Sequence, residues 1–177
     1  LHQLQVAAGR AGVELVSVAE NPVDKAWTDR PDAPMAPVVP HPIEYAGEDH
    51  AAKRERIGAI IAKEGADAAV ITAPPSIAWL FNVRGGDVSR SPLPLAAAII
   101  DKDGKATFFV EPAKISDETR AHLGNEIALR PEGEFGAGLT EYDGKTVRVD
   151  PTTASAWVLE TLRGAGAEVL QAEDPVM

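Results

Sequence analysis

The sequence predicts an α/β fold in which helices cover a mixed sheet. Short apolar or alternating segments of strand length follow one another along the chain, separated by segments whose apolar residues recur at helical spacing. In addition, an Asp-Gly pair at residues 103–104 separates two strand candidates, and such a turn joins antiparallel neighbours. Strands linked through helices together with one hairpin indicate a sheet with both parallel and antiparallel pairs.

The N-terminal region is predicted to hold a helix, a strand and an extended connection. LHQLQVAAGRAG, residues 1–12, has apolar residues at helical spacing, and VELVSV predicts a strand at Val13–Val18. Residues 22–42 are rich in proline, which lacks the N–H that helix interiors and central strands need, so an extended segment of polyproline character is expected. A chain that begins inside a helical pattern is expected to be a piece of a longer protein.

The main domain is expected to begin near Tyr45 and to open with a helix. Asp49 is a suitable N-cap for a helix that runs to about Lys63. Ile57, Ile60 and Ile61 are predicted to form its buried stripe. Gly65 is predicted to end the helix. DAAVIT, Asp67–Thr72, then predicts a short buried strand.

A short helix and a hairpin should follow. Pro74 and Pro75 can open a helix through SIAWLF, because the first turn of a helix tolerates proline. Pro94–Asp101 and Lys105–Glu111 flank the Asp-Gly turn and are predicted to be antiparallel strands.

The last third alternates helices and strands. Ser116 is a predicted N-cap for the helix SDETRAHLG, and EIALRP and KTVRVDP are strand candidates. A helix is predicted over Thr153–Arg163, before the closing strand AEVLQA. Three residues of this helix are expected to point inward: Trp157, Val158 and Leu162.

Composition excludes several classes of function. The formal net charge is −10, and the densest basic run, Lys53–Arg56, is typical of a solvated helix face, so no nucleic-acid interface is expected. No apolar run approaches the roughly 18–20 residues needed to cross a bilayer, so no membrane partner is expected. The chain has no cysteine, which excludes disulfides and thiolate zinc sites and fits a reducing cytoplasm.

No catalytic, cofactor-binding or metal-binding residue is predicted in the chain. Its four histidines are His2, His41, His50 and His122. They stand far apart in the sequence and show no metal-binding spacing. No serine lies in a Gly-x-Ser-x-Gly pattern, and GEFGAG at residues 133–138 has the wrong order of glycines for a phosphate loop.

The segment IAWLFNVRGGDV, Ile77–Val88, holds the candidate site. The residues of this segment that could contact an interface or a substrate are Asn82, Arg84, Gly85, Gly86 and Asp87. The planar guanidinium suits a carboxylate, so Arg84 and Asp87 could close the loop as a structural clasp or together contact an interface or a ligand. The aromatic residues before the loop are expected to belong to the core.

Three segments resemble the N-terminal region of a known family, the long three-domain Xaa-Pro aminopeptidases of the creatinase and prolidase superfamily. NPVDKAWTDRP from Asn21 is similar to the family's linker motif Asn-Pro-Ile/Val-Asp-x-x-Trp. IAWLFNVRGGDV is similar to its segment Ile-Ala-Trp-Leu-x-Asn-Leu-Arg-Gly-Ser-Asp-Ile, and SPLPLAAAIID follows it. The chain departs from this pattern at Gly86, where serine is usual, and at Ser91, where asparagine is common.

The resemblance implies a creatinase N-terminal fold, a mixed sheet of roughly six strands with helices on its faces. Residues 1–20 would be the tail of a truncated first domain, 21–44 a proline-rich linker and 45–177 the second domain. The family's catalytic domain, which binds two divalent metals, usually manganese, through two Asp, one His and two Glu, would be absent. By itself the chain is therefore expected to be inactive and to hold no cofactor.

The function that the resemblance implies is that of a non-catalytic module. It would scaffold the catalytic domain of a cytoplasmic Xaa-Pro aminopeptidase, shape peptide access and contribute to subunit contacts, including those of a homo-oligomer. The alternative is a stand-alone α/β peptide- or protein-binding module that uses the Arg84–Asp87 loop. Residues 1–18, separated from their sheet, are expected to pack in a new way or to mediate a dimer.

Overall fold

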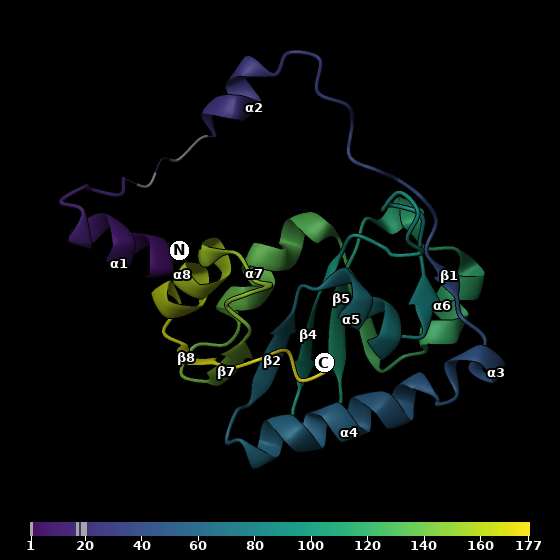
Figure 1. The fold of residues 1–177 in the computed structure, drawn as a ribbon. Helices are drawn as coiled ribbons and strands as arrows, with labels where there is room; N and C mark the ends of the chain where they lie inside the picture. Colours follow the sequence, from purple (N-terminus) through teal and green to yellow (C-terminus); the bar gives the residue numbers. More distant parts are fainter. Residues whose placement is uncertain (1, 17, 19–20) are drawn as a thin grey trace. The chain divides into compact units, whose positions relative to one another are not determined.

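The computed structural model describes residues 2–16, 18 and 21–177, and the chain divides into two compact units, residues 1–34 and 35–177 (Figure 1). The second unit begins at Met35, before the start near Tyr45 that the sequence suggested. None of the helices in the described parts of the chain is long and apolar enough to span a membrane.

In the first unit, the predicted N-terminal helix is confirmed as α1, His2–Arg10. The predicted strand at Val13–Val18 is wrong for residues 13–16 and 18, and Ser17 lies outside the described residues. A strand is stable only beside another strand, and no described strand pairs with this segment.

The proline-rich region contains regular structure that the prediction of an extended segment missed. Pro22–Ala26 forms the helix α2, whose N-cap Asn21 accepts a hydrogen bond from the Val23 amide at 3.0 Å. Proline suits this first position because no intrahelical partner awaits its N–H. Further along, Val39–Pro40 forms β1 and Ile43–Ala46 forms α3.

Six strands of the second unit form one mixed sheet in the order β6-β5-β4-β2-β7-β8, as Figure 1 shows in part. They are β2 (Ala68–Ile71), β4 (Ala97–Asp101), β5 (Ala106–Phe109), β6 (Ile127–Arg130), β7 (Thr146–Val149) and β8 (Glu168–Gln171). The hairpin β4–β5 and the pair β2–β4 are antiparallel, and the other three pairs are parallel. The predicted mixed six-stranded sheet is confirmed.

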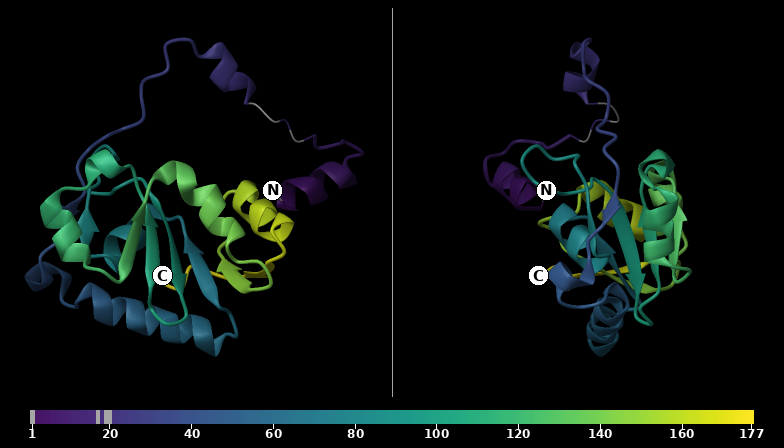
Figure 2. Two further views of the ribbon diagram at one scale, coloured as in Figure 1. Left: turned by 180° about the vertical axis from the view of Figure 1, so that it is seen from behind. Right: turned by 90° about the vertical axis from the view of Figure 1, so that its right-hand side faces the viewer.

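Helices cover both faces of this sheet. One face packs against α4 (His50–Lys63), α5 (Pro74–Leu80) and α6 (Asp117–Leu123). The other face, turned toward the reader in the reverse view of Figure 2, packs against α7 (Phe135–Thr140) and α8 (Ala156–Gly164). Two short 3-10 helices, Pro112–Lys114 and Glu132–Glu134, lie in the connections.

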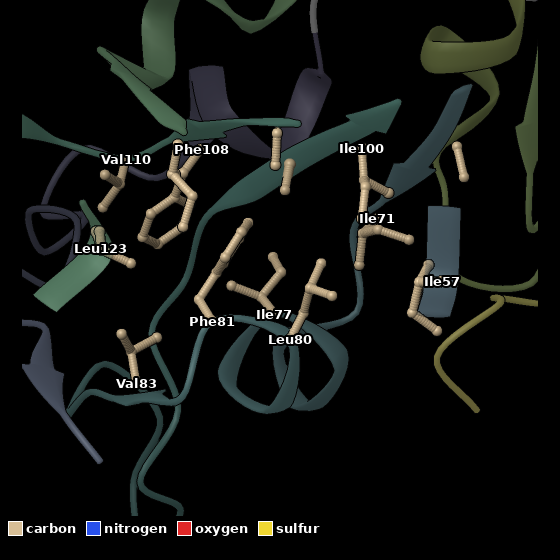
Figure 3. Packing of buried hydrophobic residues seen from close by; sticks show 14 of the residues in the cluster. Ile57, Ile71, Ile77, Leu80, Phe81, Val83, Ile100, Phe108, Val110 and Leu123 are labelled. Carbon is tan, nitrogen blue, oxygen red and sulfur yellow. The ribbon is translucent and has the colours of Figure 1, made fainter. Parts of the chain in front are cut away.

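The period-two pattern of the strands divides the core into two clusters. In β2, Ile71 belongs to the cluster under α4 and α5, whereas its neighbour Val70 belongs to the cluster under α7 and α8. Figure 3 shows the first cluster, where Ile77, Leu80 and Phe81 of the α5 segment point at the sheet. The expectation that the aromatic residues of this segment are core is confirmed for Phe81, which is fully buried.

The predicted helix starts agree with the structure where a capping side chain marks them. Asp49 accepts a hydrogen bond from the Ala51 amide at 2.7 Å, and Ser116 accepts one from the Thr119 amide at 3.1 Å. Helix α8 begins at Ala156 instead of Thr153, because the Asp150 carbonyl oxygen holds the preceding residues in a turn.

The inward direction predicted for three residues of α8 is correct for Val158 and Leu162 and wrong for Trp157. Trp157 is 50% exposed, and its ring lies 5.9 Å from that of Phe135. Val158 and Leu162 lie four positions apart and therefore share one face of α8, whereas Trp157 lies about 100° around the helix from Val158.

Candidate functional site

The candidate loop is built where α5 ends and β3, Val83–Arg84, begins. Asn82 has a positive φ of 48°, a conformation that asparagine tolerates better than most residues. Its Oδ1 accepts a hydrogen bond from Lys53 Nζ at 2.6 Å, and its Nδ2 donates to the Glu48 carbonyl oxygen at 2.8 Å. Asn82 is buried, so its role at this site is to set the direction of the loop.

The strand β3 pairs antiparallel with β1 and joins the proline-rich segment to the loop. Val39 lies opposite Arg84, and Pro40 lies opposite Val83. Val38, just before β1, is fully buried, and its amide donates to the Lys114 carbonyl oxygen at 2.9 Å. The end of the proline-rich segment is therefore one wall of the candidate site.

Asp87 forms a buried ion pair with Lys114 and not with Arg84. Its Oδ2 lies 2.9 Å from Lys114 Nζ, and the side chains of the pair are 0% and 3% exposed. The same carboxylate accepts hydrogen bonds from the amides of Ala36 at 3.1 Å and Leu95 at 2.7 Å. The hypothesis of an Arg84–Asp87 clasp is therefore wrong, because the better-buried cation of Lys114 takes the carboxylate.

Arg84 is half-buried and is held by backbone oxygens. Its Nη1 donates to the carbonyl oxygens of Val83 at 2.8 Å and Ala78 at 3.3 Å. Carbonyl groups near the C-terminal end of a helix attract cations, which accounts for this position beside α5. The guanidinium has five N–H donors, so it keeps donors available for a carboxylate from outside the loop.

The two glycines of the loop differ in how closely they are packed. A Cβ on Gly85 would lie 2.8 Å from the backbone of Pro94, so a side chain does not fit there. A Cβ on Gly86 would lie 3.1 Å from the Ala36 Cβ, and Gly86 is exposed. Gly85 is therefore required for the close approach of two chain segments, whereas Gly86 needs only a small adjustment to accept a serine.

The prediction that Lys53–Arg56 form a solvated helix face is wrong for Lys53 and Arg54, which are buried. Lys53 is only 2% exposed, donates to the Trp79 carbonyl oxygen at 3.2 Å and lies 4.2 Å from the centre of the Trp79 ring. Burial lowers the pKa of Lys53; the charge of Glu48 opposes this effect, while that of Arg84 adds to it. Sequence reasoning missed this lysine, since its contacts come from residues 26 and 29 positions away.

Arg54 is also buried, and it braces the β4–β5 hairpin. Its Nη1 donates to the Gly104 carbonyl oxygen at 2.7 Å, and its Nη2 lies 3.4 Å from Glu126. Glu55 and Arg56 are exposed, as the run suggested, and Arg56 pairs with Glu48 at 2.7 Å.

A second polar cluster fixes the C-terminal segment. Arg148 donates through Nε to the Glu173 carbonyl oxygen at 2.8 Å and also pairs with Glu64. Asp150 accepts hydrogen bonds from the Thr152 hydroxyl at 2.7 Å and from the Asp174 amide at 3.0 Å. Burial favours a raised pKa for Asp150, but these hydrogen bonds outweigh it and the pKa is lowered.

Two further contacts between titratable side chains lie in the described part of the chain, Tyr142 with Asp101 and His50 with His122. Within the described residues there is no group of three or more His, Asp or Glu side chains that could hold a metal ion. Tyr142 donates to Asp101 at 2.8 Å; burial raises the pKa of both groups, so the tyrosine stays protonated. The fold does bring His50 and His122 together, with 4.9 Å between ring centres, although they are distant in sequence.

Comparison with known proteins places this architecture in one family. A family model described as the creatinase/prolidase N-terminal domain matches residues 29–177. A "Probable Xaa-Pro aminopeptidase P" of Leptosphaeria maculans is 31% identical over 169 residues, which cover 94% of this chain and 28% of that protein. Aminopeptidase P1 of Arabidopsis thaliana is 39% identical over 117 residues, which cover 64% and 18%. The chain thus spans less than a third of these relatives.

Two solved structures share the fold. The X-prolyl aminopeptidase of Caenorhabditis elegans, described as a cytosolic enzyme with a di-nuclear active site, superposes with a TM-score of 0.84 at 24% identity; the match covers 97% of this chain and 29% of that one. The N-terminal domain of the cytoplasmic peptidase PepQ of Mycobacterium tuberculosis H37Rv superposes with a TM-score of 0.53 at 19% identity, covering 71% and 95%.

Proposed function

This chain belongs to the creatinase/prolidase N-terminal domain family, and we propose that it serves as the non-catalytic N-terminal region of a cytoplasmic Xaa-Pro aminopeptidase. The observation that carries the proposal is the extent of the match, which covers nearly the whole chain but less than a third of each relative. No metal-binding group of side chains occurs among the described residues.

The complete protein would release the N-terminal residue from peptides whose second residue is proline. Its two divalent metal ions, with manganese expected, would bind in a catalytic region outside this chain. The di-nuclear active site named for the Caenorhabditis elegans relative supports this assignment. The part played by the present chain would be to position that catalytic region and to limit access to it.

The face around Arg84 is the proposed contact with the catalytic region or with a second subunit. Exposed apolar side chains gather on the segments that adjoin the loop: Met35, Val39, Ile43, Tyr45 and Leu95. Exposed apolar groups beside a cation that has no carboxylate partner among the described residues are typical of a protein-binding surface. Arg84 would then bind an acidic group of the catalytic region, of the other subunit or of the peptide.

The loop alone is a poor candidate for a stand-alone binding module. The side-chain polar atoms of Asn82 and Asp87 bind partners inside the domain, and Gly85 is packed against Pro94. Only Arg84 and Gly86 offer atoms to an outside partner, which is too few for a stable interface. These contacts favour a role within a larger protein.

The test compares the 177-residue chain with the product of the whole reading frame that contains it. Both are assayed with Mn²⁺ on a peptide that has proline in the second position, before and after treatment with a chelator. The longer protein should cleave the peptide only with metal, and the 177-residue chain should not cleave it at all. Metal-dependent cleavage by the chain alone would refute the non-catalytic role.

A further inference from the structure

Two histidines of the second unit link three helices through a short series of hydrogen bonds. His50 Nε2 contacts the carbonyl oxygen of His122 at 2.9 Å, and His122 Nε2 contacts the carbonyl oxygen of Phe81 at 3.0 Å. His50 is the first residue of α4, His122 lies in the last turn of α6, and Phe81 follows the end of α5. The pair therefore joins helices that are far apart in the sequence.

The hydrogen-bond partners determine which nitrogens carry hydrogen. A carbonyl oxygen only accepts, so Nε2 of each ring must be the donor, and in the neutral ring Nδ1 is then an acceptor. His50 is 9% exposed, and its Nδ1 is buried without a hydrogen-bond partner in the described part of the chain. A second proton on His50 would place an N–H group and a positive charge where nothing accepts them.

The neighbouring charges reinforce this preference for a neutral ring. Burial lowers the pKa of His50; the contact with the His122 carbonyl and the charge of Asp49 oppose it, and the charges of His122 and Arg54 add to it. Arg54 lies on α4 with His50, and Asp49 is the N-cap of that helix. His122 faces His50 from α6. From the end of α5 the pair meets an uncharged carbonyl group, that of Phe81.

We propose that His50 and His122 form an acid-sensitive tie that holds α4, α6 and the end of α5 together at neutral pH and opens in a mildly acidic medium. A protonated His50 would leave its buried position and release α6, whose His122 donates to the Phe81 carbonyl oxygen directly before Asn82, the residue that directs the candidate loop. The tie would thus couple the pH of the medium to the order of the segment that carries Arg84. This behaviour belongs to the chain itself and does not depend on the proposed function.

The direction of the effect follows from proton linkage. The folded state keeps His50 neutral to a lower pH than the unfolded chain, whose histidine has the ordinary pKa of 6.5. The contribution to stability is complete above that value and is lost as the pH falls from 6.5 through the lowered pKa of the folded state. One proton changes the folding equilibrium constant by at most about tenfold per pH unit.

The first experiment measures urea unfolding of the 177-residue chain by circular dichroism between pH 7.5 and 5. The comparison is with His50→Gln, whose side-chain amide can still donate to the His122 carbonyl but cannot titrate, and with the control Asn125→Gln, an exposed position outside the pair where no titratable group is added or removed. The folding equilibrium constant of the natural chain and of the control should fall toward acid by several-fold more than that of His50→Gln. An equal fall in the natural chain and in His50→Gln would overturn the proposal.

A second experiment needs no variant and reads the tie directly. Histidine-labelled chain is titrated by NMR, and hydrogen exchange is followed at the amides of His41 and Gly85, which bond to Asn82 and Pro92 around the loop. His50 should titrate below pH 6.5, and the protection of these amides, corrected for intrinsic exchange, should fall in parallel. A His50 that titrates at 6.5 or above, or protection that does not change with pH, would contradict the tie.

Discussion

Buried charges of the second unit hold the candidate loop in place from two sides. Lys53 reaches Asn82 from α4, and Lys114 reaches Asp87 from the short 3-10 helix before α6. Each ammonium group is nearly inaccessible to solvent, so neither can exchange its partner for water without a cost. The loop is therefore set by two lysines that do not belong to it.

Replacing Asp87 should test this arrangement at the level of one residue. Asp87→Asn leaves the Lys114 ammonium buried without a countercharge, and removing one partner of a buried pair costs about 3–5 kcal/mol. The free energy of unfolding, measured with urea at pH 7, should fall by about this amount.

The matched control for Asp87→Asn is the exposed pair of Arg130 and Glu134, which lie 2.9 Å apart. Glu134→Gln should cost no more than about 1 kcal/mol, because solvent screens such pairs. The double variant Asp87→Asn/Lys114→Met should recover part of the loss. If Asp87→Asn were no more harmful than Glu134→Gln, the buried pair would not be a structural anchor.

At the level of elements, α7 shows how packing can override a local preference. GEFGAG resembles a glycine-rich loop, and the sequence predicted no helix there, yet residues 135–140 are helical. The glycines let α7 approach the sheet closely, since a Cβ on Gly138 would overlap the ring of Phe109. The rings of Phe109 and Phe135 lie 5.2 Å apart beside this contact.

A substitution at Gly138 separates packing from helix propensity. Alanine favours a helix over glycine by about 1 kcal/mol, but at this position the Phe109 ring would have to move, at a cost of about 1–3 kcal/mol. Gly138→Ala should therefore lower the melting temperature. Gly164→Ala, at the end of α8, should leave the melting temperature unchanged or raise it, because an added Cβ there would meet no side chain or other segment within 4 Å. A stabilised Gly138→Ala would show that α7 does not need the close approach.

At the level of the whole molecule, the segment after α1 has strand-like composition but no strand. Val13, Leu15, Val16 and Val18 are exposed, and no described strand of the sheet pairs with them. Unpaired segments of β-branched and apolar residues pair readily with other chains. Self-association of the chain through residues 1–18, which include this segment, therefore stays a prediction.

Light scattering tests this prediction over a range of protein concentrations. The 177-residue chain should show a rising average mass with concentration, and a version that begins at Ala19 should remain at its monomer mass. The proline-rich segment and the second unit stay intact in the shorter version, which makes it the proper control. The same mass for both versions would remove the dimer option.

The sequence by itself determined the order of the six strands of the sheet and of the helices α4, α5, α6 and α8. Capping residues, period-two strands and the Asp-Gly turn are local signals, and local backbone geometry is sufficient to produce them, as Asp49 and Ser116 illustrate. The resemblance of two motifs was also sufficient to identify the family before the fold was known. Absence of a local signal explains the miss at α7, where glycines conceal a helix.

Only the tertiary structure decided what each polar residue does. The partner of Asp87 lies 27 positions away, the contacts of Lys53 lie 26 and 29 positions away, and His50 meets His122 across 72 positions. Such pairings depend on which helices the sheet brings together, and on burial, which turns a nominally solvated lysine into an anchor. Residue types and their spacing do not predict these long-range pairings or the burial of the lysines, because both arise only when the chain has folded.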